Sequence, residues 1–83
     1  MKVTVRYFAS IREALGHSTE VVDTASGSVG ALRDELLQRG GAFAQSLARG
    51  KAVRIAVDQV MSDEAAALRE GTEVAFFPPV TGG

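Results

Sequence analysis

The sequence of 83 residues has nine basic and ten acidic residues, a formal net charge of −1 and 46% hydrophobic residues, which fits one small globular domain and not a disordered chain. It contains no cysteine, which excludes disulfides, thiolate zinc sites and a thiol nucleophile, and it has no cluster of Lys or Arg to suggest nucleic-acid binding. No apolar run approaches the length of a membrane span and Met1 opens directly into a strand pattern, so we expect a soluble, cytoplasmic protein with no membrane or nucleic-acid partner.

The first predicted element is a half-buried strand over residues 2–9, where polar and apolar side chains alternate. The side chains expected to face the core are Val3, Val5 and Tyr7. Phe8 is out of phase with them, so we expect its ring on the other face of the sheet.

A short helical connection is predicted next. Ser10 and Glu13 have the spacing of a capping box, and Gly16 supplies a stop. Residues 17–23 then predict a second, weaker strand.

The one substantial helix is predicted over residues 29–39, with Ser28 as its N-cap. Three apolar residues have the spacing of a single buried stripe, namely Val29, Leu32 and Leu36. The side expected to face solvent carries Arg33, Asp34 and Gln38. Arg39 suits the negative end of the helix dipole, and Gly40 and Gly41 supply a left-handed stop.

Three further strands are predicted in the second half of the chain. In chain order, the elements are a turn at 43–50 with Phe43 and Leu47 facing inward, a strand at 52–59, a very short strand at 60–61, a polar connection at 62–71 anchored by Leu68, and a last strand at 72–77. The inward side chains of the longer strands are Val53, Ile55, Val57, Val74 and Phe76. This order predicts an α+β domain in which the helix covers one face of a sheet and the other face meets solvent or a partner.

The last eight residues are the most informative segment, and they divide the chain into a domain over 1–77 and an extended tail over 78–83. Two prolines, Pro78 and Pro79, cannot continue a central strand and hold the chain extended. The rest of the tail is Val80, Thr81, Gly82 and Gly83. Because glycine lacks a Cβ atom, the tip fits a narrow channel, and we expect its α-carboxylate to be free.

A binding patch is predicted on the open face. Phe8 and Phe77 are both out of phase with the core residues of their strands, and Phe77 lies at the root of the tail. Exposed aromatic residues that gather in one place suggest an interaction surface, although singly exposed apolar residues are common and carry no meaning.

The residues of a self-sufficient enzyme are missing from the sequence. His17 is the single histidine, and we expect it at a solvated turn. The acidic residues do not form a positioned acid–base pair, and no metal-ligand cluster can be assembled. If the chain takes part in chemistry, the carboxylate of Gly83 is its best reactive group.

Several motifs together resemble the small-subunit family of molybdopterin synthase, over essentially the whole chain. The motifs are Tyr7-Phe8-Ala9 with Arg12-Glu13, Ser28-Val29 before the Leu32/Leu36 helix, Ala56-Val57, and the ending Gly71-Thr72-Glu73-Val74-Ala75-Phe76-Phe77-Pro78-Pro79-Val80-Thr81-Gly82-Gly83. Two residues depart from the family pattern, Thr72 in place of Asp and Asp58 in place of Asn, and neither touches the tail.

The resemblance implies a ubiquitin-like β-grasp fold. Its mixed sheet has four to five strands, with the first and last strands parallel at the centre and one main helix packed on one face. The family also places Met61 in the patch that Phe8 and Phe77 form.

The resemblance further implies a chemistry for the tail. An ATP-dependent adenylyltransferase similar to ubiquitin-activating enzymes adenylates the Gly83 carboxylate, and a sulfur donor system converts the adenylate to a thiocarboxylate. The tail then enters the large subunit of the synthase and donates sulfur to cyclic pyranopterin monophosphate. The chain itself is expected to bind no cofactor and no metal, and to be a non-catalytic subunit of a heterotetramer.

Three alternatives stay open at this point. The first is another sulfur carrier of the same fold, such as that of the thiamine pathway, which shares Gly-Gly but not the Phe-Phe-Pro-Pro base. The second is a ubiquitin-like modifier that joins its tail to lysines. The third is an interaction module with an inert tail.

Overall fold

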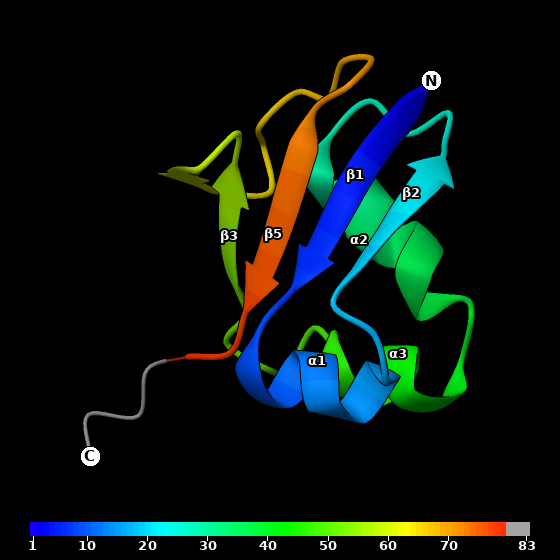
Figure 1. Cartoon of the computed structure of the whole chain (residues 1–83), viewed down its shortest axis with the longest axis vertical. Coiled ribbons are helices and arrows are strands. Elements are labelled where there is room, and N and C mark those ends of the chain that lie inside the picture. The colour runs from blue at the N-terminus through cyan, green and yellow to red at the C-terminus, as the bar shows by residue number, and fades with distance from the viewer. Residues whose placement is uncertain (80–83) are drawn as a thin grey trace.

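The computed structural model describes residues 1–79 and contains one five-stranded sheet with helices on one face (Figure 1). The strands are β1 (Lys2–Tyr7), β2 (Thr19–Asp23), β3 (Arg54–Val57), β4 (Val60–Ser62) and β5 (Glu73–Phe77). The helices are α1 (Ala9–Leu15), α2 (Val29–Leu37) and α3 (Gly41–Ser46). The strand order is β2-β1-β5-β3-β4, in which β1 and β5 are parallel and the other neighbours are antiparallel. The predicted α+β class and the β-grasp arrangement are therefore confirmed.

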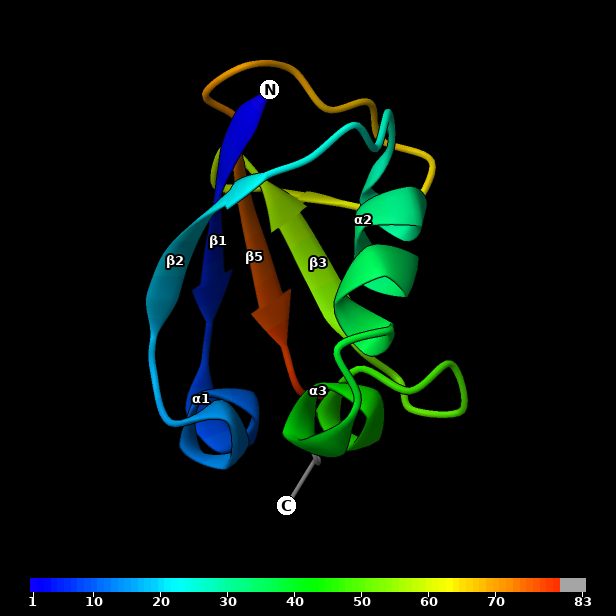
Figure 2. The same cartoon turned by 90° about the vertical axis from the view of Figure 1, so that its right-hand side faces the viewer.

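The hydrophobic core lies between the sheet and α2, which crosses one face (Figure 2). The predicted inward residues of the first and last strands are buried: Val3, Val5, Tyr7, Val74 and Phe76. The predicted stripe of α2 is buried against them: Val29, Leu32 and Leu36. The opposite face of the sheet has no helix over it in the described part of the chain, as Figure 1 shows from that side. None of the helices within residues 1–79 is long and apolar enough to cross a bilayer.

The start of α2 follows the predicted signal, whereas its end differs from the prediction. The Ser28 hydroxyl accepts a hydrogen bond from the Ala31 amide at 3.2 Å, so the predicted N-cap is confirmed. The helix ends at Leu37, two residues before the predicted end at 39. The predicted left-handed stop is not what ends the helix: its C-cap residue is Gln38 in the right-handed region, and Gly40 and Gly41, with positive φ angles of 74° and 54°, are the N-cap position and first residue of α3.

The prediction that Arg33 faces solvent is wrong. Its guanidinium is buried and donates to the backbone carbonyls of Leu47 at 2.8 Å and Ala48 at 2.7 Å. The segment after α3 folds under α2 and presents carbonyl groups that need donors, which helical periodicity alone cannot reveal. Arg33 therefore fastens this segment to the helix.

The predicted capping box at Ser10 is also wrong. Helix α1 begins at Ala9, two residues earlier than a cap at Ser10 would place it, and its N-cap position is Phe8, which makes no side-chain cap. The cause is the end of β1: the Phe8 amide donates to the Phe76 carbonyl at 3.2 Å, so the chain stays extended through Phe8. Ala9, with φ of 51°, then turns it directly into the helix.

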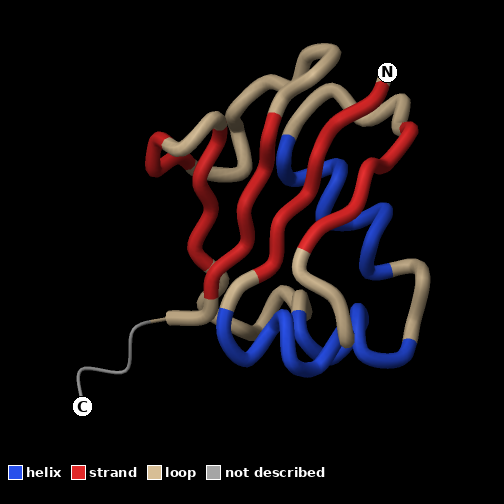
Figure 3. The backbone as a smooth tube through the Cα atoms, in the orientation of Figure 1, coloured by secondary structure: helices blue, strands red, loops and turns tan. Residues whose placement is uncertain are grey.

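The parallel pairing of β1 with β5 fixes where the tail begins. Both strands point the same way, so their carboxyl ends lie side by side next to α1. The chain leaves the sheet at this end, after β5 (Figure 3). The last strand ends at Phe77, followed by Pro78 and Pro79 outside the sheet. Residues 80–83 lie outside the described part of the chain.

Candidate functional site

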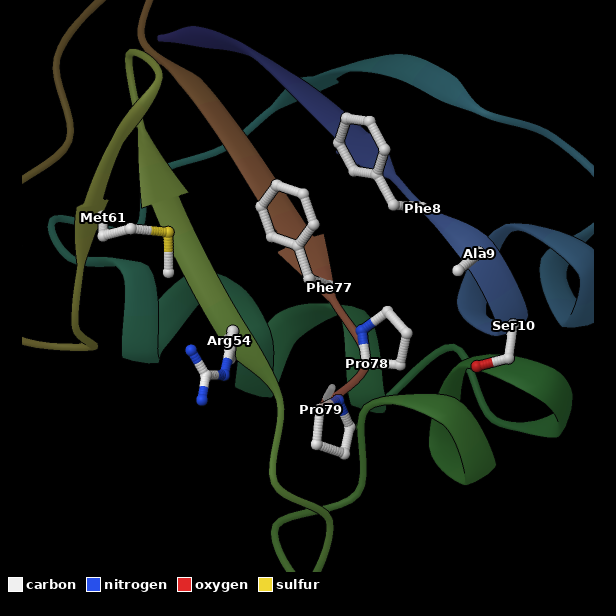
Figure 4. A pocket seen from close by; sticks show the side chains of 8 residues that line it. All are labelled: Phe8, Ala9, Ser10, Arg54, Met61, Phe77, Pro78 and Pro79. Atoms are coloured by element: carbon white, nitrogen blue, oxygen red, sulfur yellow. The ribbon is translucent and has the colours of Figure 1, made fainter. Parts of the chain in front are cut away.

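The open face of the sheet has a hollow at the root of the tail (Figure 4). Strand register explains its shape, because residues paired across neighbouring strands point to the same face. One row contains Met61, Ala56 and Ala75, and the next pairs Arg54 with Phe77. The hollow that these strands enclose together with the start of the tail has a volume of about 740 Å³.

We call this hollow the tail-root groove. The residues that line it are Phe8, Ala9, Ser10, Arg54, Met61, Phe77, Pro78 and Pro79. Four elements and the start of the tail therefore contribute to one surface. Most of its lining is apolar although it faces solvent, which is the mark of an interaction surface.

Phe8 and Phe77 form the floor of the groove as a stacked pair. Their ring centroids lie 4.5 Å apart with an angle of 10° between the ring planes. Arg6 adds a cation above the Phe8 ring, at 5.2 Å from its centroid. Both rings are half-buried, so part of the surface of each is left for a partner to cover.

Met61 provides the far wall of the groove from the short edge strand β4. Its side chain is 59% exposed, among the most exposed of the large hydrophobic residues. A flexible thioether at an exposed position adapts to the shape of a partner surface. Its place agrees with the family expectation for Met61.

A second, smaller hollow lies on the other side of the tail root and has a volume of about 430 Å³. We call it the helix-side hollow, because residues of α1 and α3 line it. Ser10, Pro78 and Pro79 line both hollows, so the two prolines form the wall between them. The charged residue of this second hollow is Lys51. The first two tail residues are thus held between two surface depressions.

The structure brings the predicted patch together, since Phe8, Met61 and Phe77 share one groove with Pro78 and Pro79. The other predicted tail residues, Val80, Thr81, Gly82 and Gly83, lie outside the described residues. Their roles therefore stay predictions.

Sequence reasoning missed two features of this groove. Arg54 lies in it, and the parity of the predicted strand at 52–59 was a usable signal, because Arg54 is out of phase with Ile55. The second feature is the hollow itself, which depends on β3 pairing with β4 and β5 so that Arg54, Met61 and Phe77 come together. That pairing follows only from strand register.

His17 is not simply solvated, as the sequence suggested. Its side chain is 39% exposed, its Nε2 atom lies 3.0 Å from a Glu20 carboxylate oxygen, and its ring packs edge-on against Tyr7. The same carboxylate accepts hydrogen bonds from the Tyr7 hydroxyl at 2.8 Å and from Arg39 at 2.9 Å. We call these four side chains the Glu20 cluster.

The Glu20 cluster shifts the pKa values of two of its members. Burial acts to raise the pKa of Glu20, but the hydrogen bonds from His17, Tyr7 and Arg39, together with the charge of Arg39, outweigh it, and the net pKa lies below its ordinary value. Burial, followed by the hydrogen bond to Glu20 and its negative charge, raises the pKa of Tyr7. The cluster ties β2 to the end of β1 and the loop after α2, so its role here is structural.

Neither hollow offers a set of residues for catalysis. No group of His, Asp or Glu within residues 1–79 has the arrangement of a metal site. The tail-root groove is lined by no carboxylate or imidazole in the described part of the chain. Its lining is mostly apolar, which suits an interaction surface better than a catalytic site.

Comparisons with known proteins show what the chain is similar to. The model of the ThiS family matches residues 5–83. The molybdopterin synthase sulfur carrier subunit of Haemophilus influenzae is 36% identical over 81 residues, which cover 98% of this chain and 99% of that protein. The protein of the same name from Escherichia coli is 38% identical with the same coverage.

Two solved structures extend the comparison. SAMP1 of Haloferax volcanii, a small archaeal modifier protein, superposes with a TM-score of 0.79 at 25% identity and full coverage of both chains. The complex of subunits 1 and 2 of the molybdopterin-converting factor of Helicobacter pylori contains a chain with a TM-score of 0.70, also at 25% identity and full coverage. The similar chain in that structure is seen together with its partner subunit.

Proposed function

Because this chain belongs to the ThiS family, with a match over residues 5–83 and three relatives at 36–38% identity named as sulfur carrier subunits, we propose that it is the sulfur carrier subunit of a molybdopterin synthase. The names of these relatives agree with the expectation of a sulfur-carrying subunit within a larger enzyme. The family description alone does not distinguish the molybdenum pathway from the thiamine pathway, whereas the relatives name the molybdopterin synthase.

The observation that carries the proposal is the stacked pair of Phe8 and Phe77 at the root of the tail. In this proposal the large subunit covers the tail-root groove and receives residues 80–83. Pro78 and Pro79 form a rigid base for the tail, because the pyrrolidine rings of these two prolines restrict the backbone to extended conformations. The known complex of subunits 1 and 2 from Helicobacter pylori supports a partner of this kind.

The proposed chemistry begins at the Gly83 carboxylate. A carboxylate oxygen attacks the α-phosphorus of ATP on an activating partner similar to ubiquitin-activating enzymes, and pyrophosphate leaves. A sulfur donor system then supplies sulfur at the oxidation level of hydrosulfide, which displaces AMP and leaves a thiocarboxylate. Since the first step consumes ATP, we place the carrier in the cytoplasm.

The thiocarboxylate is a sulfur nucleophile that needs no cysteine, in accord with the cysteine-free sequence. Inside the large subunit its sulfur forms a bond to a carbon atom of cyclic pyranopterin monophosphate, and water then cleaves the bond between that sulfur and the Gly83 carbonyl carbon, which restores the carboxylate. Positioning by the tail-root groove makes this step effectively unimolecular. Two sulfur atoms complete the dithiolene, so two loaded carriers are consumed for each product.

One added residue after Gly83 tests the role of the terminus. We expect this variant to keep its fold, by circular dichroism, and to lose molybdopterin production in a strain that lacks the natural carrier. Intact-mass measurement of the wild-type protein should show a species in which sulfur replaces one oxygen, and the extended variant should lack it. Molybdopterin production by the extended variant would overturn the proposal.

A ubiquitin-like modifier is the second candidate, favoured by the similarity to SAMP1 of Haloferax volcanii. The two candidates share an activated Gly83 and differ in the acceptor, which is a small-molecule carbon atom for the carrier and a lysine amine for the modifier. Mass spectrometry of host proteins separates them. Lysines that carry the tail of this chain would support the modifier.

A further inference from the structure

The tail root lies between two hollows whose charged lining residues are both cations. Arg54 lines the tail-root groove and Lys51 lines the helix-side hollow. No Asp or Glu lines either hollow within residues 1–79. The whole chain carries ten acidic against nine basic residues, so this positive setting is local to the tail root.

Neither cation forms an ion pair within the described part of the chain, although Arg54 and Met61 also line a third hollow whose lining includes Asp63 and Glu64. No carboxylate of residues 1–79 lies within the 4.0 Å ion-pair limit of Arg54 or Lys51, and both residues are exposed. Arg6, on the same open face as Arg54, is different, because it pairs with Glu73 at 3.9 Å. The charges at the tail root are therefore available to a partner.

The backbone holds both cations in defined places. Arg54 lies in β3 directly opposite Phe77, so its side chain is on the face of the tail-root groove (Figure 4). The Lys51 carbonyl accepts a hydrogen bond from the buried Arg33 at 3.3 Å, which ties this loop to α2. The two charges thus flank Pro78 and Pro79 on opposite sides.

A partner that covers the groove removes water from these charges. Covering a cation with apolar surface costs free energy unless a carboxylate or another acceptor meets it. A partner surface avoids this cost if it carries a ring of carboxylates, here called the acidic rim, around an apolar projection. The same carboxylates steer the encounter of the two proteins. The apolar floor would supply most of the affinity, and the cations the orientation.

On the basis of the proposed function, we infer that the surface of the large subunit covering the tail root carries carboxylates opposite Arg54 and Lys51, around an apolar projection that fills the tail-root groove. Arg54 and Lys51 are then specificity residues, which select a large subunit with an acidic entrance to its tail channel.

The test measures the affinity of the full-length carrier for its large subunit at low and at high ionic strength. We expect Arg54→Glu and Lys51→Glu each to lower the affinity about tenfold at low ionic strength, and to lower it less when salt screens the charges. The matched control is Arg69→Glu, because Arg69 lies in the connection before β5, at the other end of that strand from the tail. We expect this control to change the affinity less than about twofold.

Phe77→Ala separates this inference from the proposed function. If Phe77→Ala weakens binding but Arg54→Glu and Lys51→Glu behave like Arg69→Glu, the acidic rim is wrong and the docking surface stands. If none of the four variants alters the affinity, the proposed docking surface fails as well. Thermal unfolding of each variant establishes that it is folded.

A second readout identifies which partner carries the acidic rim. The extent of thiocarboxylate formation, measured by intact mass, reports the encounter with the activating enzyme. If Arg54→Glu and Lys51→Glu reduce this loading and leave the affinity for the large subunit unchanged, the acidic surface belongs to the activating enzyme, which overturns the inference. A change of an acidic residue of the large subunit to Lys that restores its affinity for Arg54→Glu or Lys51→Glu would support the inference directly.

Discussion

Two aromatic pairs lie back to back at the same end of the sheet, and they differ in what covers them. Tyr7 and Phe76 stack on the helix side with ring centroids 6.3 Å apart, and their exposed fractions are 1% and 0%. Phe8 and Phe77, the next residues along the chain, stack on the open face with centroids 4.5 Å apart and are half-buried. The same backbone therefore presents one pair to the core and one to solvent.

The difference between the pairs comes from the layer above each of them. On the helix side, Phe43 from α3 and His17 pack edge-on or tilted around Tyr7, with ring centroids 6.1 Å and 5.3 Å away. On the open face, no helix of residues 1–79 lies over the sheet (Figure 1). Burial of the first pair stabilises the folded chain, whereas much of the burial of the second pair is left for a partner. Stability and binding are thus assigned to adjacent residues of the same strands.

The largest expected effect is a loss of folding stability when a ring of the buried Tyr7–Phe76 pair is removed. Phe76→Ala should lower the free energy of unfolding by about 3–5 kcal/mol, because it removes a fully buried ring and leaves a cavity. A domain of this size has a total stability on the order of 4–12 kcal/mol, so the variant should be close to unfolding. Urea denaturation followed by far-UV circular dichroism measures the change.

Phe76→Leu is the control for this prediction, since it keeps most of the buried volume, and it should cost clearly less than Phe76→Ala. A loss below about 1 kcal/mol for Phe76→Ala would contradict the assignment of this pair to stability.

A substitution in the Phe8–Phe77 pair should affect binding more than it affects the free energy of unfolding. Phe77→Ala should lower the affinity for the large subunit at least tenfold, about 1.4 kcal/mol or more, because aromatic anchors in a covered groove dominate binding. Its effect on the free energy of unfolding should be smaller than that of Phe76→Ala, since the ring is only half-buried. Titration calorimetry and urea denaturation of the same variant measure both quantities.

A double-mutant cycle sharpens this comparison. If the stacked rings act as one surface, Phe8→Ala and Phe77→Ala should not be additive in binding free energy. Unchanged affinity of both single variants would show that the open pair is not the docking surface.

The alternation of residues 2–9 and 72–77 was enough to predict which ring of each neighbouring pair faces the core. It could not predict that Ala56 lies opposite Ala75, because strand register depends on how β3 pairs with β5. The same limit applies to Arg33, whose carbonyl partners come from a segment fourteen to eighteen residues away in the sequence. Patterns along one element thus predict its faces, and contacts between elements need the fold.

The smallest expected effect is on the pH dependence of folding stability. It concerns the Tyr7 hydroxyl, which donates a hydrogen bond to Glu20. Glu20 has a lowered pKa in the folded state, so its charged form is stabilised by folding. This contribution is fully present above the unfolded pKa, ordinarily 4.5, and it is lost as pH falls through the lower folded value.

The difference in the free energy of unfolding between wild type and Glu20→Gln should therefore be constant near neutral pH and shrink below pH about 4.5. Glu13→Gln, at an exposed position of α1, serves as the control for removal of a negative charge. Thermal unfolding across this pH range measures the difference. A difference that grows on acidification would reverse the sign of the linkage and would show that the hydrogen bonds of the Glu20 cluster do not favour its charged form. Because the cluster lies around Tyr7 and not around Phe8, the affinity of Glu20→Gln for the large subunit at neutral pH should match that of wild type.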